Sequence, residues 1–273
     1  MSIIYRIVLS IKKGGGHLQE LFNLQGKTAI ITGGGRGLGK QMATALAKAG
    51  ANLVLCSRKV EACEAVCKEL RPLGVQCLAI QCDVTKAADI QKVINATVNT
   101  FGSIDILVNN SGASWSAPVD DLPEEKWDYV MDVNAKGTFL FSQAAAKVMV
   151  LQGSGKIVNI ASVLGLGGVN PQLMDTIAYN TSKGAIITFT KDLAVKLAKH
   201  NIQVNAIAPG FFPTKITKGI LENSKHSLQA HIPAGRFGSE TDLMGPILFL
   251  SSKASDYVTG HILLVDGGIH AQV

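Results

Sequence analysis

Two side chains suited to proton transfer lie one helical turn apart in the segment Tyr-Asn-Thr-Ser-Lys, which runs from Tyr179 to Lys183. Residues four positions apart share one face of a helix, so the phenol and the ammonium are expected to be neighbours. A phenol has an ordinary pKa of about 10, and a nearby cation lowers that pKa because it favours the phenolate. The pair therefore predicts a proton shuttle, and Ser162, which follows a strand-like run, offers a third polar group.

A glycine-rich run, Thr-Gly-Gly-Gly-Arg-Gly-Leu-Gly at residues 32–39, is the second chemical signal. It follows a β-rich run at 27–31, opens into a helix-forming segment at 40–49, and is succeeded by a strand-like run at 51–56. In a strand–turn–helix–strand unit such glycines let the backbone approach a pyrophosphate, which the N–H groups and dipole of the helix N-terminus attract. The run therefore predicts dinucleotide binding.

The same alternation of strand and helix continues to the end of the chain. Further strands are expected at 75–82, 104–109, 156–160, 203–208 and 261–265, and helices at 60–70, 87–100, 136–151, 179–200 and 241–251. This pattern predicts an α/β fold with a parallel sheet covered by helices on both faces. No linker or repeat is evident after residue 25, so residues 26–273 are expected to form one domain, preceded by an N-terminal extension at 1–25.

Composition limits the class of protein. The chain has 273 residues, of which 47% are apolar and 17% charged, as expected for one large globular domain. The net charge of +6 comes from scattered Lys and Arg, which favours anionic cofactors or substrates over nucleic acid. The apolar run at 2–11 is interrupted by Arg6 and is too short to span a bilayer, so no membrane segment and a cytoplasmic location are expected. The extension could be an extra edge strand, an oligomer contact or a non-native start.

All five cysteines lie in the segment from Cys56 to Cys82. This stretch contains neither histidine nor a Cys-x-x-Cys pair, so no metal site is predicted. The cysteines are expected to be small apolar core residues in a reducing cytosol.

The residues with chemical potential follow the ends of six predicted strands. Ligands of open parallel sheets bind beyond the carboxyl ends of the strands, so these residues are expected to converge on one edge. They are residues 33–39, 57–58, 83, 110–112, 162 and 209–210.

Taken together, these motifs resemble those of the short-chain dehydrogenase/reductase family over about residues 24–270. The glycine motif of that family is matched by Thr32, Gly33, Gly37 and Gly39, and its Asn-Asn-Ala-Gly element by residues 109–112, with Ser111 in place of alanine. Its catalytic tetrad falls on Asn134, Ser162, Tyr179 and Lys183, and its Pro-Gly motif on Pro209 and Gly210. The resemblance implies a single doubly wound Rossmann domain whose seven-stranded parallel sheet has the order 3-2-1-4-5-6-7.

The resemblance also implies a chemistry. Tyr179 would donate a proton to a carbonyl oxygen, or remove it in the oxidative direction, while the Ser162 hydroxyl stabilises the developing charge. Lys183 would lower the pKa of Tyr179 and bind the nicotinamide ribose. Asn134 would hold a water that links Lys183 to solvent, or brace a bend in a helix.

Charge decides the expected cofactor. Folds that prefer NAD place Asp or Glu at the end of the second strand, where this chain has Ser57 and Arg58. Arg36 and Arg58 could grip a 2′-phosphate from two sides, so NADP(H) is predicted to be preferred, with NAD(H) possible as a second cofactor. Arg58 could instead be merely solvated, and Arg36 could serve only the helix start.

The other expected cofactor contacts follow from the resemblance. Asp83 would bond the adenine amino group, or cap the following helix, and Val84 would supply its N–H. Thr214 would touch the nicotinamide amide, or act as an ordinary turn or cap residue. The full expected set is Gly33, Gly35, Arg36, Gly37, Leu38, Gly39, Ser57, Arg58, Asp83, Val84, Asn110, Ser111, Gly112, Tyr179, Lys183, Pro209, Gly210 and Thr214.

Parts of the chain look similar to gluconate 5-dehydrogenase-like enzymes and others to β-ketoacyl reductases. The expected activity is interconversion of a ketone and a secondary alcohol, with a 3-oxoacyl thioester or a keto-sugar acid or polyol as substrate. The alternative is a non-catalytic nicotinamide-nucleotide sensor or structural subunit. By analogy with the family, a homotetramer (or dimer) paired through the helices at 136–151 and 179–199 and through the C-terminal strand is expected. The pocket is expected to be covered by a lid from residue 211 to about 233.

Overall fold

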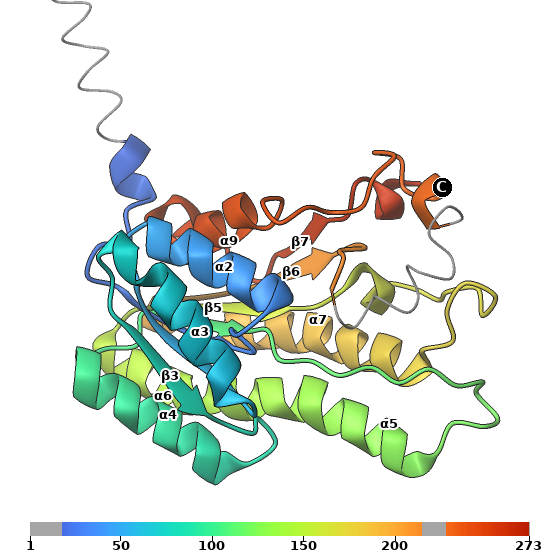
Figure 1. The fold of residues 1–273 in the computed structure, drawn as a ribbon, viewed down its shortest axis with the longest axis horizontal. Coiled ribbons are helices and arrows are strands. Elements are labelled where there is room, and N and C mark those ends of the chain that lie inside the picture. Colours follow the sequence, from blue (N-terminus) through green and yellow to red (C-terminus); the bar gives the residue numbers. More distant parts are fainter. Residues whose placement is uncertain (1–17, 215–227, 273) are drawn as a thin grey trace, which may run out of the picture.

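A parallel sheet forms the centre of the protein in a computed structural model that describes residues 18–214 and 228–272 (Figure 1). In this described part the sheet has seven strands in the order β3-β2-β1-β4-β5-β6-β7, all paired in parallel, which confirms the predicted topology. The strands are β1 (Thr28–Thr32), β2 (Asn52–Ser57), β3 (Cys77–Gln81), β4 (Ile106–Asn109), β5 (Gly155–Ile160), β6 (Ile202–Pro209) and β7 (Ile262–Val265).

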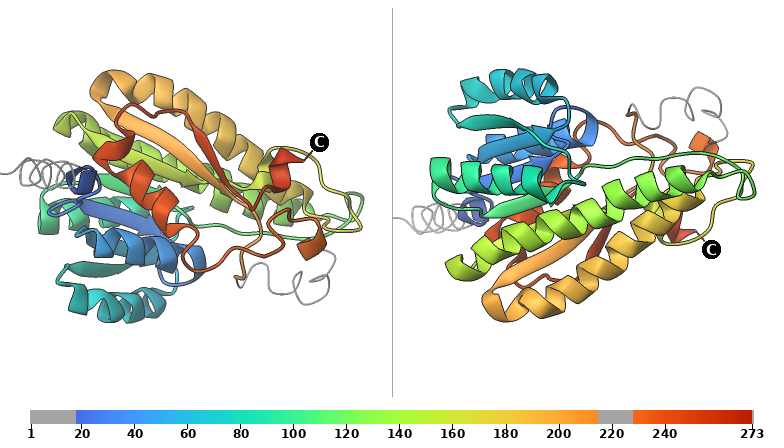
Figure 2. Two further views of the ribbon diagram at one scale, coloured as in Figure 1. Left: turned by 90° about the horizontal axis from the view of Figure 1, so that it is seen from above. Right: turned by 90° about the horizontal axis from the view of Figure 1, so that it is seen from below.

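Helices cover both faces of this sheet (Figures 1 and 2). One face carries α2 (Gly37–Lys48), α3 (Val60–Leu70) and α9 (Met244–Ser251), and the other α4 (Ala87–Phe101), α6 (Gly137–Gln152) and α7 (Ile177–Leu197). Because both faces are covered, every residue of β1, β5 and β6 is buried, and the strands read as continuous apolar runs with few polar interruptions.

Each face has its own apolar core. Met42, Leu46 and Ile247 pack on one side of the sheet, and Ile90, Phe141 and Met149 on the other. None of the described helices is both long and apolar enough to cross a membrane.

One helix of the structure has no counterpart in the sequence prediction. α5 (Glu124–Met131) begins after Pro123 and continues through the π-helical segment η2 (Asp132–Lys136) into α6. The three segments form one long rod beside α7 (Figure 2). Val130 is the only buried residue of α5, so this helix lacks the apolar stripe on which periodicity arguments depend.

The packed part of the chain includes Leu24, upstream of the predicted domain start. Leu24 is buried in the core beside α2, and its N–H donates a hydrogen bond of 2.9 Å to the carbonyl oxygen of Ala49. Most of the predicted extension, residues 1–17, lies outside the described residues, as does the central part of the predicted lid, 215–227.

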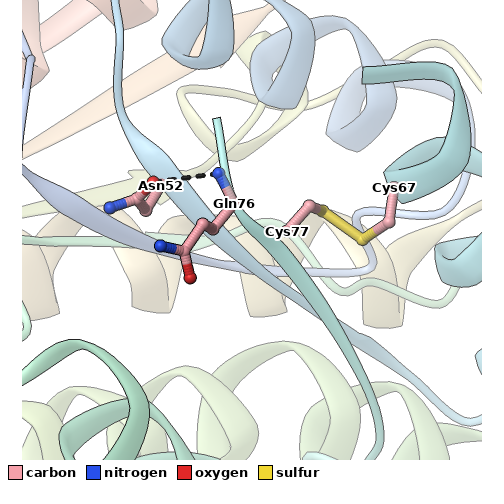
Figure 3. The surroundings of a disulfide bond; sticks show 4 residues. All are labelled: Asn52, Cys67, Gln76 and Cys77. Atoms are coloured by element: carbon pink, nitrogen blue, oxygen red, sulfur yellow. Dashed lines mark hydrogen bonds between the residues drawn. A yellow bond between two sulfur atoms is a disulfide. The ribbon is translucent and has the colours of Figure 1, made fainter. Parts of the chain in front are cut away.

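The expectation that the cysteines all serve as simple core residues is corrected by a disulfide bond between Cys67 and Cys77 (Figure 3). Cys67 lies in the last turn of α3 and Cys77 is the first residue of β3; their Cα atoms are 5.2 Å apart, a separation that suits a disulfide. The short connection through η1 (Arg71–Leu73) brings them together, a proximity that spacing alone does not reveal. The other three cysteines, Cys56, Cys63 and Cys82, are free and buried.

We predict that this disulfide stabilises the α3–β3 unit. Closing a loop of this length lowers the entropy of the unfolded chain, so Cys67→Ser should lower the free energy of unfolding by about 2–3 kcal/mol. Urea denaturation without reductant measures the difference. As a control, a dithiol should destabilise the unaltered protein by a similar amount and leave the Cys67→Ser variant unchanged. Equal stability of both proteins without reductant would contradict the prediction.

Candidate active site

The carboxyl ends of the strands meet at one edge of the sheet, where the segments that follow β4, β5 and β6 extend together (Figure 1). The glycine turn between β1 and α2 lies at this edge. Gly33 and Gly37 adopt positive φ values of 65° and 51°, which other residues rarely do. A Cβ on Gly39 would overlap the carbonyl oxygen of Gly33, so the backbone itself forms the surface of the turn.

The start of α2 fits an anionic group. Its first turn carries no acidic side chain, and Arg36 stands at the N-cap with an exposed side chain. Leu38 packs against the core and anchors this turn. Gly35 faces α3, where a Cβ would come within 2.8 Å of Ala62. Glycine backbone, exposed helix N–H groups and a nearby cation are the features that bind a pyrophosphate.

Residues after β4 hold the glycine turn in place. The Asn110 side chain donates hydrogen bonds to the carbonyl oxygens of Thr32, at 2.9 Å, and Gly33, at 3.2 Å. In return the Thr32 hydroxyl accepts hydrogen bonds from the backbone N–H groups of Asn110 and Ser111, both at 2.9 Å. The structure thus joins two of the predicted motifs, and Thr32 does so from a buried position.

Tyr179 and Lys183 lie on one face of α7, as their spacing predicts. The Lys183 Nζ atom is 5.6 Å from the centre of the Tyr179 ring and donates a hydrogen bond of 2.7 Å to the carbonyl oxygen of Ile160 at the end of β5. Ser162 caps the short helix that follows β5, accepting a hydrogen bond from the N–H of Leu164. Its hydroxyl lies close enough to Tyr179 to affect the pKa of that phenol. The three groups therefore come together.

The electrostatics differ from the prediction in one respect. Burial raises the pKa of Tyr179, and the nearby Ser162 hydroxyl offsets this only in part. Burial also lowers the pKa of Lys183 to about 8. The pKa of Tyr179 is therefore shifted in the opposite direction to the expected one, because the effect of burial is larger than the effect of Ser162.

Asn134 joins the π-helical segment η2 to the segment that follows β4. It is fully buried within η2, accepts a hydrogen bond from the N–H of Ala113 and donates one to the carbonyl oxygen of the same residue, at 2.7 and 2.9 Å. Gly112 lies alongside, because a Cβ built on it would be 3.5 Å from Asn134 Oδ1 and 3.9 Å from Lys183 Nζ. Asn134 thus holds the backbone of Ala113, a contact that neither of its two expected roles includes.

A second group of predicted residues gathers at the ends of β2 and β3. The guanidinium of Arg58 donates a hydrogen bond of 3.3 Å to the Tyr129 hydroxyl, and the Ser57 hydroxyl donates one of 2.7 Å to the carbonyl oxygen of Lys59. Burial tends to raise the pKa of Asp83, but hydrogen bonds from the N–H and hydroxyl of Thr85, together with the nearby Arg58, lower it overall. Asp83 therefore forms a local turn with Thr85, and its side chain is charged near neutral pH. The alternative expectation that Asp83 caps the following helix is wrong, because the N-cap of α4 is Lys86 and no side chain caps it.

Val84 and the Pro-Gly motif complete the edge. Val84 is buried against Gly137 at the start of α6. Pro209 ends β6, and Gly210 donates a backbone hydrogen bond of 3.0 Å to Val265. Thr214 reaches across to the glycine turn, since its Cγ2 atom lies 3.7 Å from the position of a Cβ on Gly37.

The segment after Ala113 crosses toward α7. The N–H of Ala117 donates a hydrogen bond of 3.1 Å to the carbonyl oxygen of Asp175, four residues before Tyr179. Trp115, between these two anchors, is 41% exposed, and the Lys126 ammonium lies 4.6 Å from the centre of its ring. Within residues 18–214 and 228–272, no cluster of His, Cys, Asp and Glu is arranged to bind a metal ion.

Sequence reasoning missed one contributor to this site. Ser182 provides a buried hydroxyl that accepts a hydrogen bond from Asn134, the residue that also holds the backbone of Ala113. Ser182 could have been noticed as a polar residue on the inner face of a helix.

Comparison with known proteins agrees with this geometry. A family model described as enoyl-(acyl carrier protein) reductase matches residues 33–270. The chain is 40% identical over 257 residues to 5-keto-D-gluconate 5-reductase of Escherichia coli strain K12, covering 92% of this chain and 98% of that protein. It is 38% identical over 245 residues to the 3-oxoacyl-[acyl-carrier-protein] reductase FabG of Staphylococcus aureus, covering 89% and 98%.

A solved structure is similarly close. The gluconate 5-dehydrogenase of Burkholderia cenocepacia J2315, in complex with NADP and tartrate, superposes with a TM-score of 0.89 at 36% identity, over 94% of this chain and all of that one. The matched family model, these relatives and the parallel sheet with its Tyr179–Lys183 site lead to one conclusion: the chain belongs to the short-chain dehydrogenase/reductase family.

Proposed function

We propose that the protein is an NADP(H)-dependent oxidoreductase that interconverts a ketone and a secondary alcohol, with Tyr179 as the acid and base. The observation that carries the proposal is the meeting of Tyr179, Ser162 and Lys183 at the sheet edge that also bears the glycine turn. Relatives named for 5-ketogluconate and gluconate favour a keto-sugar acid as substrate. A 3-oxoacyl thioester is the second candidate, supported by the similarity to FabG.

Two parts of the site fit the cofactor. One is the glycine turn with the N-terminus of α2, and the other is Lys183. Gly33, Gly37 and Gly39 would face its pyrophosphate, and Lys183 its nicotinamide ribose. When bound, NADP(H) supplies or accepts the hydride.

The side chains of this protein would handle the oxygen and its proton. Ser162 and Tyr179, whose hydroxyls are close enough for one to affect the pKa of the other, would both donate to one carbonyl oxygen and stabilise the charge that develops on it. The raised pKa of Tyr179 keeps the phenol protonated near neutral pH, as donation requires. Lys183, with its pKa near 8, is largely an ammonium at neutral pH and would stabilise the phenolate that remains.

A substrate panel tests this function. The protein should oxidise NADPH more efficiently with 5-ketogluconate than with a 3-oxoacyl thioester. The loss of NADPH absorbance measures the rate of each reaction. Tyr179→Phe should lower kcat by about 10²- to 10⁴-fold, because the positioned proton donor is lost, and leave the affinity for NADPH nearly unchanged.

The matched control is Tyr257→Phe, because Tyr257 is a fully exposed tyrosine outside the site. This variant should keep normal activity. Tight NADPH binding without turnover of any ketone would contradict the proposal and favour a sensor.

The preference for NADP(H) is proposed to depend on Arg58. Its guanidinium lies near Asp83 and Tyr129 at the end of β2, and no carboxylate occupies the β2 end to repel a 2′-phosphate. Structural relatives with bound NADP support the preference for NADP(H). Arg36, exposed at the start of α2, would contribute from the other side.

We predict that Arg58→Ala lowers the ratio of kcat/KM for NADPH to that for NADH by roughly 10- to 100-fold. This is the loss of affinity expected when one hydrogen bond to a charged group is removed. The control is Arg71→Ala, which removes an exposed arginine at the far end of α3. Steady-state kinetics with both cofactors give the ratio. An unchanged ratio in Arg58→Ala would remove Arg58 from cofactor selection.

A homotetramer (or dimer) is proposed from an apolar surface on α6 and α7. A groove of about 540 Å³ there is lined by Phe139, Leu151, Phe189, Leu193 and their neighbours. Leu151 is 89% exposed, which is costly for a large apolar side chain unless a second copy covers it.

Leu151→Glu should therefore reduce the mass measured by light scattering, because a carboxylate would be buried against an apolar partner face. Leu73→Glu, at an exposed apolar residue outside the groove, should leave the mass unchanged. A monomeric unaltered protein would refute the proposal.

A further inference from the structure

Ser182 is a buried hydroxyl between the two principal residues of the site, and the proposed chemistry assigns it no role. Its side chain is 0% exposed. Its Oγ atom donates a hydrogen bond of 2.7 Å to the carbonyl oxygen of Tyr179 and accepts one of 2.8 Å from the Asn134 Nδ2 atom. This hydroxyl therefore connects α7 to the π-helical segment η2.

The contact with Ser182 completes the hydrogen bonding of the Asn134 amide group. One N–H of the carboxamide donates to Ser182, the other donates to the carbonyl oxygen of Ala113, and Oδ1 accepts from the N–H of Ala113. Both hydrogens are used, so the orientation of the amide is determined. An oriented Asn134 in turn holds both polar backbone groups of Ala113.

The backbone that Asn134 holds runs beside the reactive amine. Gly112 immediately precedes Ala113, and a Cβ built on it would be 3.9 Å from Lys183 Nζ. A shift of this backbone would change the space available next to Lys183. Displacements of about 1 Å in a positioning element are enough to lower a catalytic rate substantially.

We propose that Ser182 is a positioning residue: it orients the Asn134 carboxamide and, through it, holds the Gly112–Ala113 backbone against Lys183. The inference rests on the proposed function and adds a residue to it. Without the hydroxyl, one N–H of Asn134 would be buried with no acceptor, a costly arrangement that the amide can relieve only by moving.

The same helix provides a matched control. Thr190 is also 0% exposed; its hydroxyl donates to the carbonyl oxygen of Ile186 at 2.7 Å and accepts from the side-chain amide of Asn159 at 3.0 Å. This arrangement repeats that of Ser182, about two turns further along α7 and away from Tyr179. Ser182→Ala and Thr190→Val thus remove equivalent hydrogen bonds, and only the first lies at the site.

The kinetic test compares these two variants. Ser182→Ala should lower kcat on the order of 10-fold, with the KM for NADPH changed less than about 3-fold, whereas Thr190→Val should keep kcat within about 2-fold. If Ser182 acts through Asn134, the double variant Ser182→Ala/Asn134→Ala should be no slower than Asn134→Ala alone. Thermal unfolding of each variant verifies that it is folded.

A second measurement needs no substrate. Hydrogen exchange of the Ala113 amide, followed by mass spectrometry of the peptide that contains it, should be at least about 10-fold faster in Ser182→Ala and unchanged in Thr190→Val. Because exchange does not depend on turnover, it decides the positioning role even if no ketone proves to be a substrate.

Three results would overturn the inference. They are unchanged exchange at Ala113 in Ser182→Ala, equal loss of kcat in Ser182→Ala and Thr190→Val, and additive effects of Ser182→Ala and Asn134→Ala. Inactivity of the unaltered protein toward every ketone, with faster exchange in Ser182→Ala, would instead count against the proposed function alone.

Discussion

The site depends on the burial of one amine. Lys183 extends from α7 to the end of β5, where its Nζ atom donates a hydrogen bond to the carbonyl oxygen of Ile160. Burial lowers the pKa of this amine to about 8, so its charge is retained near neutral pH but is held at a cost. The backbone of Gly112 and the ring of Tyr179 lie around this amine. The carbonyl oxygen of Ile160 offsets part of the free-energy cost of burying the ammonium, because it replaces part of the lost hydration.

The rest of the carboxyl edge of the sheet is shaped by the need of backbone polar groups for hydrogen-bond partners. Parallel strands leave backbone N–H and carbonyl groups unpaired where they stop, and such groups must find partners when buried. Thr32 and Asn110 provide these partners between β1 and β4, and Asn134 provides them for Ala113. The side chains that satisfy the backbone are therefore the same ones that hold the glycine turn and the segment after β4 in place.

The two halves of the site are held by different means. The half around Tyr179 and Lys183 is held by buried hydrogen bonds between α7, η2 and the segment after β4. The half around Arg58 is built on α3, whose first turns press on Gly35 and whose last turn is bonded to β3 through Cys67 and Cys77.

The sequence by itself determined the fold class and the strand order implied by its family resemblance, because alternating apolar segments and glycine turns are local properties of the chain. It also determined that Tyr179 and Lys183 share a helix face, since helical spacing is geometric. Only the tertiary structure decided the direction of the Tyr179 pKa, because burial depends on what packs around the ring. The Cys67–Cys77 bond, the path of α5 and the contacts of Ser182 likewise depend on which distant segments meet in space.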